Sequence, residues 1–154
     1  MRRELILDII TNIPGIGFNE IAKRVDLSNG VVSHYLLQLL KNGYIIKSDE
    51  SRAKYFVHNI PKKDMKLIIV FRNNTNLKII KFLLEKGNPV KSKAIAEAIK
   101  KSVATVSTSL KKMEREKIIY REIMNENSKL TSDIAYKISN EKFVRDLILR
   151  YNMN

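Results

Sequence analysis

The stretch SNGVVSHYLLQLLKNGYI, residues 28–45, decides the fold, because it holds a helix start, a helix stop and a strand start. Ser28 is a residue type that favours the N-cap of a helix, and Asn42-Gly43 interrupts the apolar pattern that follows it. Tyr44 and β-branched residues come directly after the glycine. The stretch therefore predicts a helix from Ser28 to about Leu40 and then a strand.

Two shorter helices are predicted before this stretch. Apolar residues at helical spacing predict a helix over residues 2–12, which Pro14-Gly15 ends. Asn19 is the predicted cap of a short helix, Glu20–Arg24, and Asp26-Leu27 is the turn that follows it.

A hairpin is predicted after the third helix. Its strands are Tyr44–Lys47 and Tyr55–His58, and the polar turn 49–52 joins them. A helix, a helix-turn-helix and a hairpin, in this order, make up a winged helix. Residues 1–60 are therefore predicted to form one winged-helix module.

The same pattern returns 74 residues later. Without a gap before the hairpins, a shift of 74 residues places apolar residues on apolar residues and serine on serine: Ile6 on Ile80, Ile9 on Leu83, Ile10 on Leu84, Ile16 on Val90, Ile21 on Ile95, Ala22 on Ala96, Val25 on Ile99, Ser28 on Ser102, Val32 on Val106, Ser33 on Ser107, Leu36 on Leu110, Leu39 on Met113 and Ile45 on Ile119. Chance alignment of amphipathic helices is not expected to keep one offset across three helices. A second module is predicted over residues 77–139, with helices at 77–86, 92–99 and 102–115 and strands at Ile118–Ile123 and Ile134–Ile138.

Two further helices complete the predicted architecture. The linker, residues 61–76, holds the apolar run Leu67–Phe71 and predicts a helix from about Lys62 to Arg72, packed on a module or on a second copy of the chain. Residues 140–154 predict a C-terminal helix capped by Asn140, which either closes the second core or pairs with a second copy. The expected fold class is mainly α with small β-hairpin wings: two tandem winged helix-turn-helix modules, a linker helix and a C-terminal helix.

The string PGIGFNEIAKRVDLSNGVVSHYLLQLLKNGYI, residues 14–45, resembles the archaeal winged helix-turn-helix transcriptional regulators. In that family a Pro-Gly-Ile turn precedes the helix-turn-helix, and a glycine ends the recognition helix before the wing. Many members have a second winged helix after a linker with an Arg-Asn sequence, as at Arg72-Asn73. The resemblance implies DNA-binding regulation. The second copy departs from the pattern, because Lys117 replaces the glycine, so the end of its third helix is expected to fray or to run longer.

Composition favours a polyanionic partner. The 154 residues suit one domain or two small ones, and 29 Lys and Arg against 16 Asp and Glu give a net charge of +13. The excess is uneven: residues 1–64 have 10 basic and 7 acidic side chains, whereas residues 65–154 have 19 and 9. The absence of cysteine excludes disulfides and thiolate metal sites. The N-terminus is a poor signal peptide and no apolar run could span a bilayer, so a soluble cytoplasmic protein is expected.

The outer face of each third helix carries the candidate DNA-binding residues, because this helix of a helix-turn-helix lies in the major groove. With Val32, Leu36, Leu39 and Leu40 inward, the first helix presents Gly30 for close approach, His34 and Gln38 for base edges, and Leu37 for a thymine methyl or a protein contact. With Val106, Leu110 and Met113 inward, the second presents Ala104 for close approach, Thr108 for phosphate or base, and Lys111, Lys112 and Arg115 for phosphate or guanine. Arg52 in the first turn and Lys129 in the second hairpin could meet the DNA backbone or the minor groove. The full set of candidates is Ser28, Asn29, Gly30, Ser33, His34, Gln38, Lys41, Arg52, Lys54, Ser102, Thr105, Ser107, Thr108, Lys111, Lys112, Arg115 and Lys129.

The sequence argues against an enzyme but leaves two alternatives to a transcriptional regulator open. Without a glycine-rich phosphate loop, a nucleophile elbow or an HExxH sequence, an enzyme is not expected, and no cofactor or small-molecule ligand is indicated. His34 has no other ligand residue at metal-binding spacing on its face. Tandem winged helices also serve as protein–protein scaffolds, and a sequence-independent architectural DNA-binding protein would have the same basic faces. The favoured hypothesis is a transcriptional regulator that binds double-stranded DNA, as a homodimer through the linker or the C-terminal helix.

Overall fold

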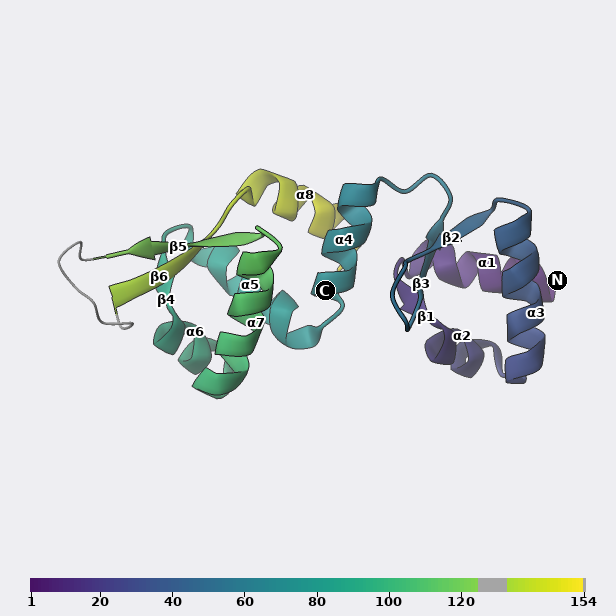
Figure 1. Cartoon of the computed structure of the whole chain (residues 1–154), viewed down its shortest axis with the longest axis horizontal. Coiled ribbons are helices and arrows are strands. Elements are labelled where there is room, and N and C mark those ends of the chain that lie inside the picture. Colours follow the sequence, from purple (N-terminus) through teal and green to yellow (C-terminus); the bar gives the residue numbers. More distant parts are fainter. Residues whose placement is uncertain (125–132, 154) are drawn as a thin grey trace. The chain divides into compact units, whose positions relative to one another are not determined.

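The computed structural model describes residues 1–124 and 133–153, and they form two compact units, Met1–Ile69 and Val70–Asn154 (Figure 1). The first unit contains α1 (Arg2–Asn12), β1 (Ile16–Gly17), α2 (Phe18–Val25), α3 (Asn29–Lys41), β2 (Ile45–Lys47) and β3 (Lys54–Val57). The linker helix α4 (Lys62–Phe71) crosses the boundary between the units. The second unit contains α5 (Asn74–Lys86), β4 (Val90–Lys91), α6 (Ser92–Ile99), α7 (Val103–Arg115), β5 (Ile119–Ile123), β6 (Ile134–Ile138) and α8 (Glu141–Arg150). The predicted fold class, mainly α with small β-hairpin wings, is confirmed.

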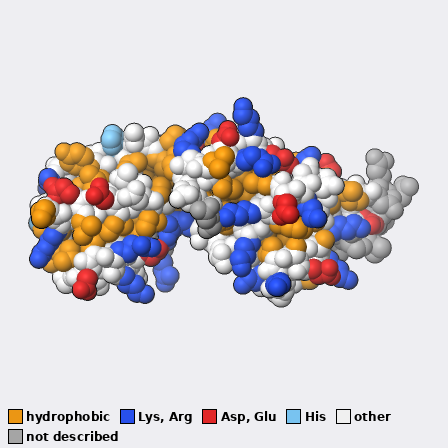
Figure 2. Space-filling model, turned by 180° about the vertical axis from the view of Figure 1, so that it is seen from behind, with side chains coloured by type: hydrophobic (Ala, Val, Ile, Leu, Met, Phe, Trp, Pro, Cys, Tyr) orange, Lys and Arg blue, Asp and Glu red, His pale blue; other side chains and the backbone are white. Residues whose placement is uncertain are grey.

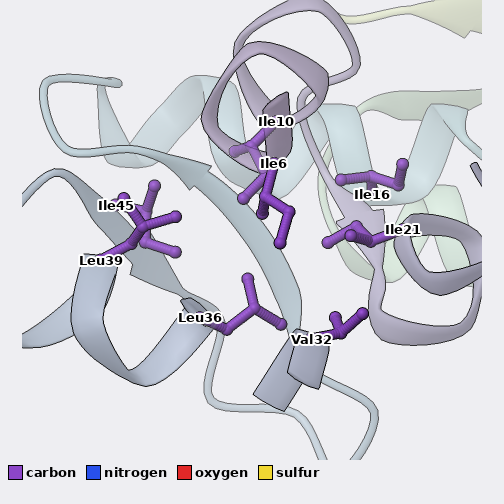
Figure 3. Close-up of a cluster of buried hydrophobic side chains, with 8 residues drawn as sticks. All are labelled: Ile6, Ile10, Ile16, Ile21, Val32, Leu36, Leu39 and Ile45. Carbon is purple, nitrogen blue, oxygen red and sulfur yellow. The ribbon is translucent and has the colours of Figure 1, made fainter. Parts of the chain in front are cut away.

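The first core gathers side chains from five elements. Figure 3 shows eight of them pointing toward one another: Ile6, Ile10, Ile16, Ile21, Val32, Leu36, Leu39 and Ile45. None exposes more than 2% of its surface. Full burial of such a side chain contributes about 1.5–3 kcal/mol, so this cluster holds α1, α2 and α3 against the hairpin.

The second core repeats this arrangement at the predicted offset. Six counterparts of the first core are buried in the second unit, at Ile80, Ile95, Val106, Leu110, Met113 and Ile119, whereas Leu84 and Val90, the counterparts of Ile10 and Ile16, are half-buried. The linker and the C-terminal helix bury part of their apolar residues within the chain, namely Ile68, Val70 and Phe71 of α4 and Val144 and Leu147 of α8, whereas Leu149 of α8 is exposed.

Each wing is a three-stranded antiparallel sheet rather than the predicted two-stranded hairpin. The strand orders are β1-β3-β2 and β4-β6-β5, with Ile16 opposite Tyr55 and Val90 opposite Tyr136. β1 and β4 are two residues long, too short to show an alternating pattern in the sequence. Burial raises the pKa of both Tyr55 and Tyr136.

Two local predictions were wrong. Asn19 does not cap α2, because the helix begins at Phe18 and Gly17 holds the N-cap position. The end of α7 neither frays nor runs longer: Lys117 adopts a left-handed φ of 61°, as Gly43 does at 75°, and its N–H donates to the carbonyl of Glu114 at 2.9 Å. Tertiary contacts of the hairpin outweigh the cost of that conformation, which is roughly 1–2 kcal/mol for a residue with a Cβ.

Candidate nucleic-acid interface

The outer face of α3 is positioned by a capped start and a buried opposite face. The Ser28 Oγ accepts a hydrogen bond from the Val31 N–H at 3.4 Å, which begins the helix. Val32, Leu36 and Leu39 are buried. The residues exposed on the other side are Asn29, Gly30, Ser33, His34, Leu37 and Lys41, whereas Gln38 and Leu40 are half-buried. The helix therefore presents most of the predicted face to solvent.

His34 and Gln38 contact each other on this face. The His34 Nε2 and the Gln38 Nε2 lie 3.2 Å apart, one turn of helix from each other. The His34 ring also meets the edge of Tyr35, with the ring centroids 5.4 Å apart. Each contact restricts the conformations of a side chain that could read a base edge. Less conformational entropy is then lost when that side chain is ordered on a ligand.

Gly30 has no internal reason to be glycine. A Cβ at this position would meet nothing within 4 Å. Gly30 is the second residue of α3, and glycine also has more conformational freedom to lose on folding than alanine has. The open space beside Gly30 fits the predicted close approach of an external surface.

The start of α7 is held by hydroxyl groups. The Ser102 Oγ accepts from the Thr105 N–H at 3.1 Å and donates to the Thr105 Oγ1 at 2.8 Å. The Thr108 Oγ1 donates to the carbonyl of Ala104 at 3.1 Å. Ser107 is half-buried. The Ser102 and Thr108 hydroxyl protons already have acceptors, so these two oxygens would face DNA mainly as acceptors.

Three cations form the most basic part of this face. Lys111, Lys112 and Arg115 are exposed, and none forms an ion pair within residues 1–124 and 133–153. The acidic neighbour on the same helix is already paired, because the Glu114 carboxylate accepts from the Arg121 Nε at 2.6 Å. The positive charge of the outer face of α7 is therefore not cancelled locally.

The first wing adds two cations beside a groove. Arg52 lies exposed in the β2–β3 turn, and Lys54 is half-buried at the start of β3. Both line a groove of about 500 Å³ together with the first turn of α2, Phe18, Asn19 and Glu20. The sequence did not single out this turn, because its closeness to the wing depends on β1 pairing with β3. The third predicted wing residue, Lys129, lies outside the described residues.

Metal-binding clusters and membrane-spanning helices are both absent from the described residues. No group of three or more His, Cys, Asp or Glu side chains in it could hold a metal ion. None of its helices is long and apolar enough to cross a membrane.

The model of the winged helix-turn-helix DNA-binding family matches the chain twice, at residues 2–46 and 72–120, which together make up more than half of it. The chain belongs to this family. The first match runs from α1 into β2 and the second from Arg72 into β5, so the two matches include both candidate helices, α3 and α7. No curated protein matches the chain significantly in sequence.

Several solved structures are similar in part. A possible transcriptional regulator from Methanosarcina mazei is 21% identical, with 70% of this chain and 85% of that chain covered and a TM-score of 0.41. MepR of S. aureus in its DNA complex is 17% identical, with 81% and 76% covered and a TM-score of 0.41. ScpB from Mycobacterium tuberculosis is 10% identical, with 95% and 94% covered and a TM-score of 0.36. The family assignment does not rest on these likenesses.

Proposed function

We propose that this chain is a cytoplasmic transcriptional regulator of the archaeal, tandem winged-helix type that binds double-stranded DNA with both modules. The observation that carries the proposal is the outer face of α7, where Lys111, Lys112 and Arg115 are exposed and form no ion pair among the described residues. Cations placed on the groove-facing helix of a helix-turn-helix bind phosphates and thereby supply most of the affinity. Membership of the winged helix-turn-helix DNA-binding family supports DNA binding independently.

The two modules take different parts of this task. On α7, the cations Lys111, Lys112 and Arg115 suit phosphate, and Ser102, Thr105, Ser107 and Thr108 lie on or next to the start of the same helix. On α3, His34 and Gln38 can hydrogen-bond base edges while Gly30 admits a close approach. Ser28, Asn29, Ser33 and Lys41 surround this reading pair, and Arg52 and Lys54 of the wing reach the backbone. We therefore assign most of the affinity to the second module and sequence preference to the first.

The proposed organisation is residues 1–60 and 77–139 as the DNA-binding modules, 61–76 as the linker and 140–154 as the C-terminal helix. A homodimer through the linker or the C-terminal helix would present two copies of each recognition helix and favour a palindromic or repeated site. Sedimentation equilibrium of the full chain, at concentrations up to the solubility limit, tests the dimer. A monomer throughout contradicts it.

Binding to a random-sequence duplex, followed by fluorescence anisotropy across a salt series, tests the function. With several phosphate contacts the affinity falls on the order of a thousandfold between 50 and 200 mM salt. Absence of binding at low salt contradicts the proposal and leaves a protein–protein scaffold.

Selection from a random DNA pool then separates a regulator from an architectural protein. A regulator enriches a defined site, and His34→Ala or Gln38→Ala changes the ranking of sites more than it changes affinity for random DNA. An architectural protein enriches no site, and both variants leave every affinity unaltered.

A further inference from the structure

The second unit has a face that the proposed DNA contacts do not use. Figure 1 shows α5 behind α7, and Figure 2 shows that side, where Lys and Arg side chains lie among hydrophobic ones on the second unit. Two grooves lie on either side of the outer surface of α5. One, of about 340 Å³, separates α5 from the end of α6, and the other, of about 390 Å³, separates α5 from α8. They share Lys81 and Glu85, so they form one continuous surface.

The lining of both grooves includes apolar side chains. Phe82 and Ile99 line the first groove, and Leu84, Ile148 and Leu149 line the second. Leu149 is 75% exposed, the largest exposed fraction of any leucine among the described residues. An apolar surface of this shape, between helices, is the kind that receives the apolar face of an amphipathic helix.

The charges around the grooves decide the partner. Lys78, Lys81 and Lys100 surround the first groove and Arg145 the second, against a single acidic residue, Glu85. These five side chains form no ion pair in the part of the chain that the structure describes. A second copy docked through the same face would bring like charges together, which costs binding energy, whereas an acidic segment would find a cation on each side.

We propose that the α5–α6–α8 face of the second unit binds an acidic amphipathic helix of a partner protein while α7 remains free for DNA. Leucines of the partner at positions i, i+3, i+4 and i+7 enter the two grooves, and its carboxylates meet Lys78, Lys81, Lys100 and Arg145. A partner bound at this face would cover the C-terminal helix α8, so the linker helix α4 remains as the candidate dimer surface. The inference goes beyond DNA binding and does not depend on it.

The test uses a fluorescein-labelled peptide of about 18 residues, five turns of helix, with leucine at i, i+3, i+4 and i+7 and glutamate elsewhere. Anisotropy with the full chain at about 150 mM salt, where surface charges are screened beyond about 8 Å, measures its affinity. Lys81→Glu with Arg145→Glu is expected to weaken peptide binding at least tenfold and to leave affinity for DNA within about twofold. The matched control, Lys111→Glu with Lys112→Glu, carries the same charge change on α7 and is expected to do the reverse.

A peptide of equal composition, with its leucines moved off helical spacing, separates groove binding from charge attraction. It is expected to bind at least tenfold more weakly, and equal binding overturns the proposal. Loss of peptide binding in the α7 control also overturns it, because the peptide would then occupy the DNA face. Dissociation of a homodimer by Leu149→Asp in sedimentation equilibrium overturns it as well, since a second copy would then be the occupant. Failure of DNA binding by the unmodified chain affects only the proposed function.

Discussion

Removing two lysines from α7 should flatten the salt dependence of DNA binding. Lys111 and Lys112 are exposed and unpaired among the described residues, so each is free to bind one phosphate. Each phosphate contact contributes about 0.9 to the slope of log affinity against log salt. Lys111→Ala with Lys112→Ala should therefore lower the slope by about 1.8. Between 50 and 200 mM salt, this removes roughly a twelvefold change in affinity.

The measurement is fluorescence anisotropy on one random-sequence duplex at four or more salt concentrations. The control is Lys62→Ala with Lys63→Ala, which removes the same charge from exposed positions of α4. Exposed substitutions of this kind usually alter stability by less than about 0.5 kcal/mol, so thermal unfolding should not separate the variants. Equal slopes for the two double variants would refute the reasoning, because the cations of α7 would then act only through net charge.

Three further predictions concern a glycine, a lysine and a pair of tyrosines. Gly30→Ala should stabilise the fold by about 0.5–1 kcal/mol, measured by urea unfolding, and should weaken DNA binding; unchanged binding would exclude a close approach there. Lys117→Gly should stabilise the fold by up to about 1 kcal/mol in the same assay. The strain relieved at the left-handed position exceeds the stability lost because glycine adds entropy to the unfolded chain, and a less stable variant would contradict the φ of 61°. The raised pKa values of Tyr55 and Tyr136 mean that the folded state keeps these two protons to a higher pH than the unfolded chain does. Their contribution to the free energy of unfolding is therefore full below pH 10 and is lost as the pH rises through the folded pKa values. Tyr55→Phe with Tyr136→Phe should reduce that loss in a series of unfolding measurements between pH 9 and 11, and an unchanged pH dependence would contradict it.

The helices were predictable because local and tertiary signals agree in them. Ser28 and Ser102 cap α3 and α7 as the sequence indicates, and the inward positions are buried except for Leu40, which is half-buried. The strands β1 and β4 were not predictable, because they depend on pairing with residues about 40 positions away. The same limit applies to the groove between α2 and the first wing, which exists only once β1 lies beside β3.

The outer faces were predictable in composition but not in their internal contacts. Helical spacing places His34 beside Gln38, yet their 3.2 Å contact depends on rotamers that the spacing leaves open. At Lys117 the residue type was misleading. A lysine in place of glycine predicted an altered helix end, yet its backbone has the left-handed φ that Gly43 has in the first module.

Because one scaffold carries two different outer faces, the first module can be given the face of the second. The offset of 74 residues aligns Leu37 with Lys111 and Gln38 with Lys112. Leu37 is 64% exposed, so lysine is tolerated there without a cavity in the core. If α3 and α7 both lie against DNA, Leu37→Lys with Gln38→Lys should raise the salt slope by about 1.8 while sequence preference falls, since the partner of His34 is lost. The control is Thr11→Lys with Asn12→Lys, which adds lysines at two exposed positions of α1, away from the helix-turn-helix. An equal rise in both variants would mean that α3 does not contact phosphate, and the first module would then serve a role other than DNA binding.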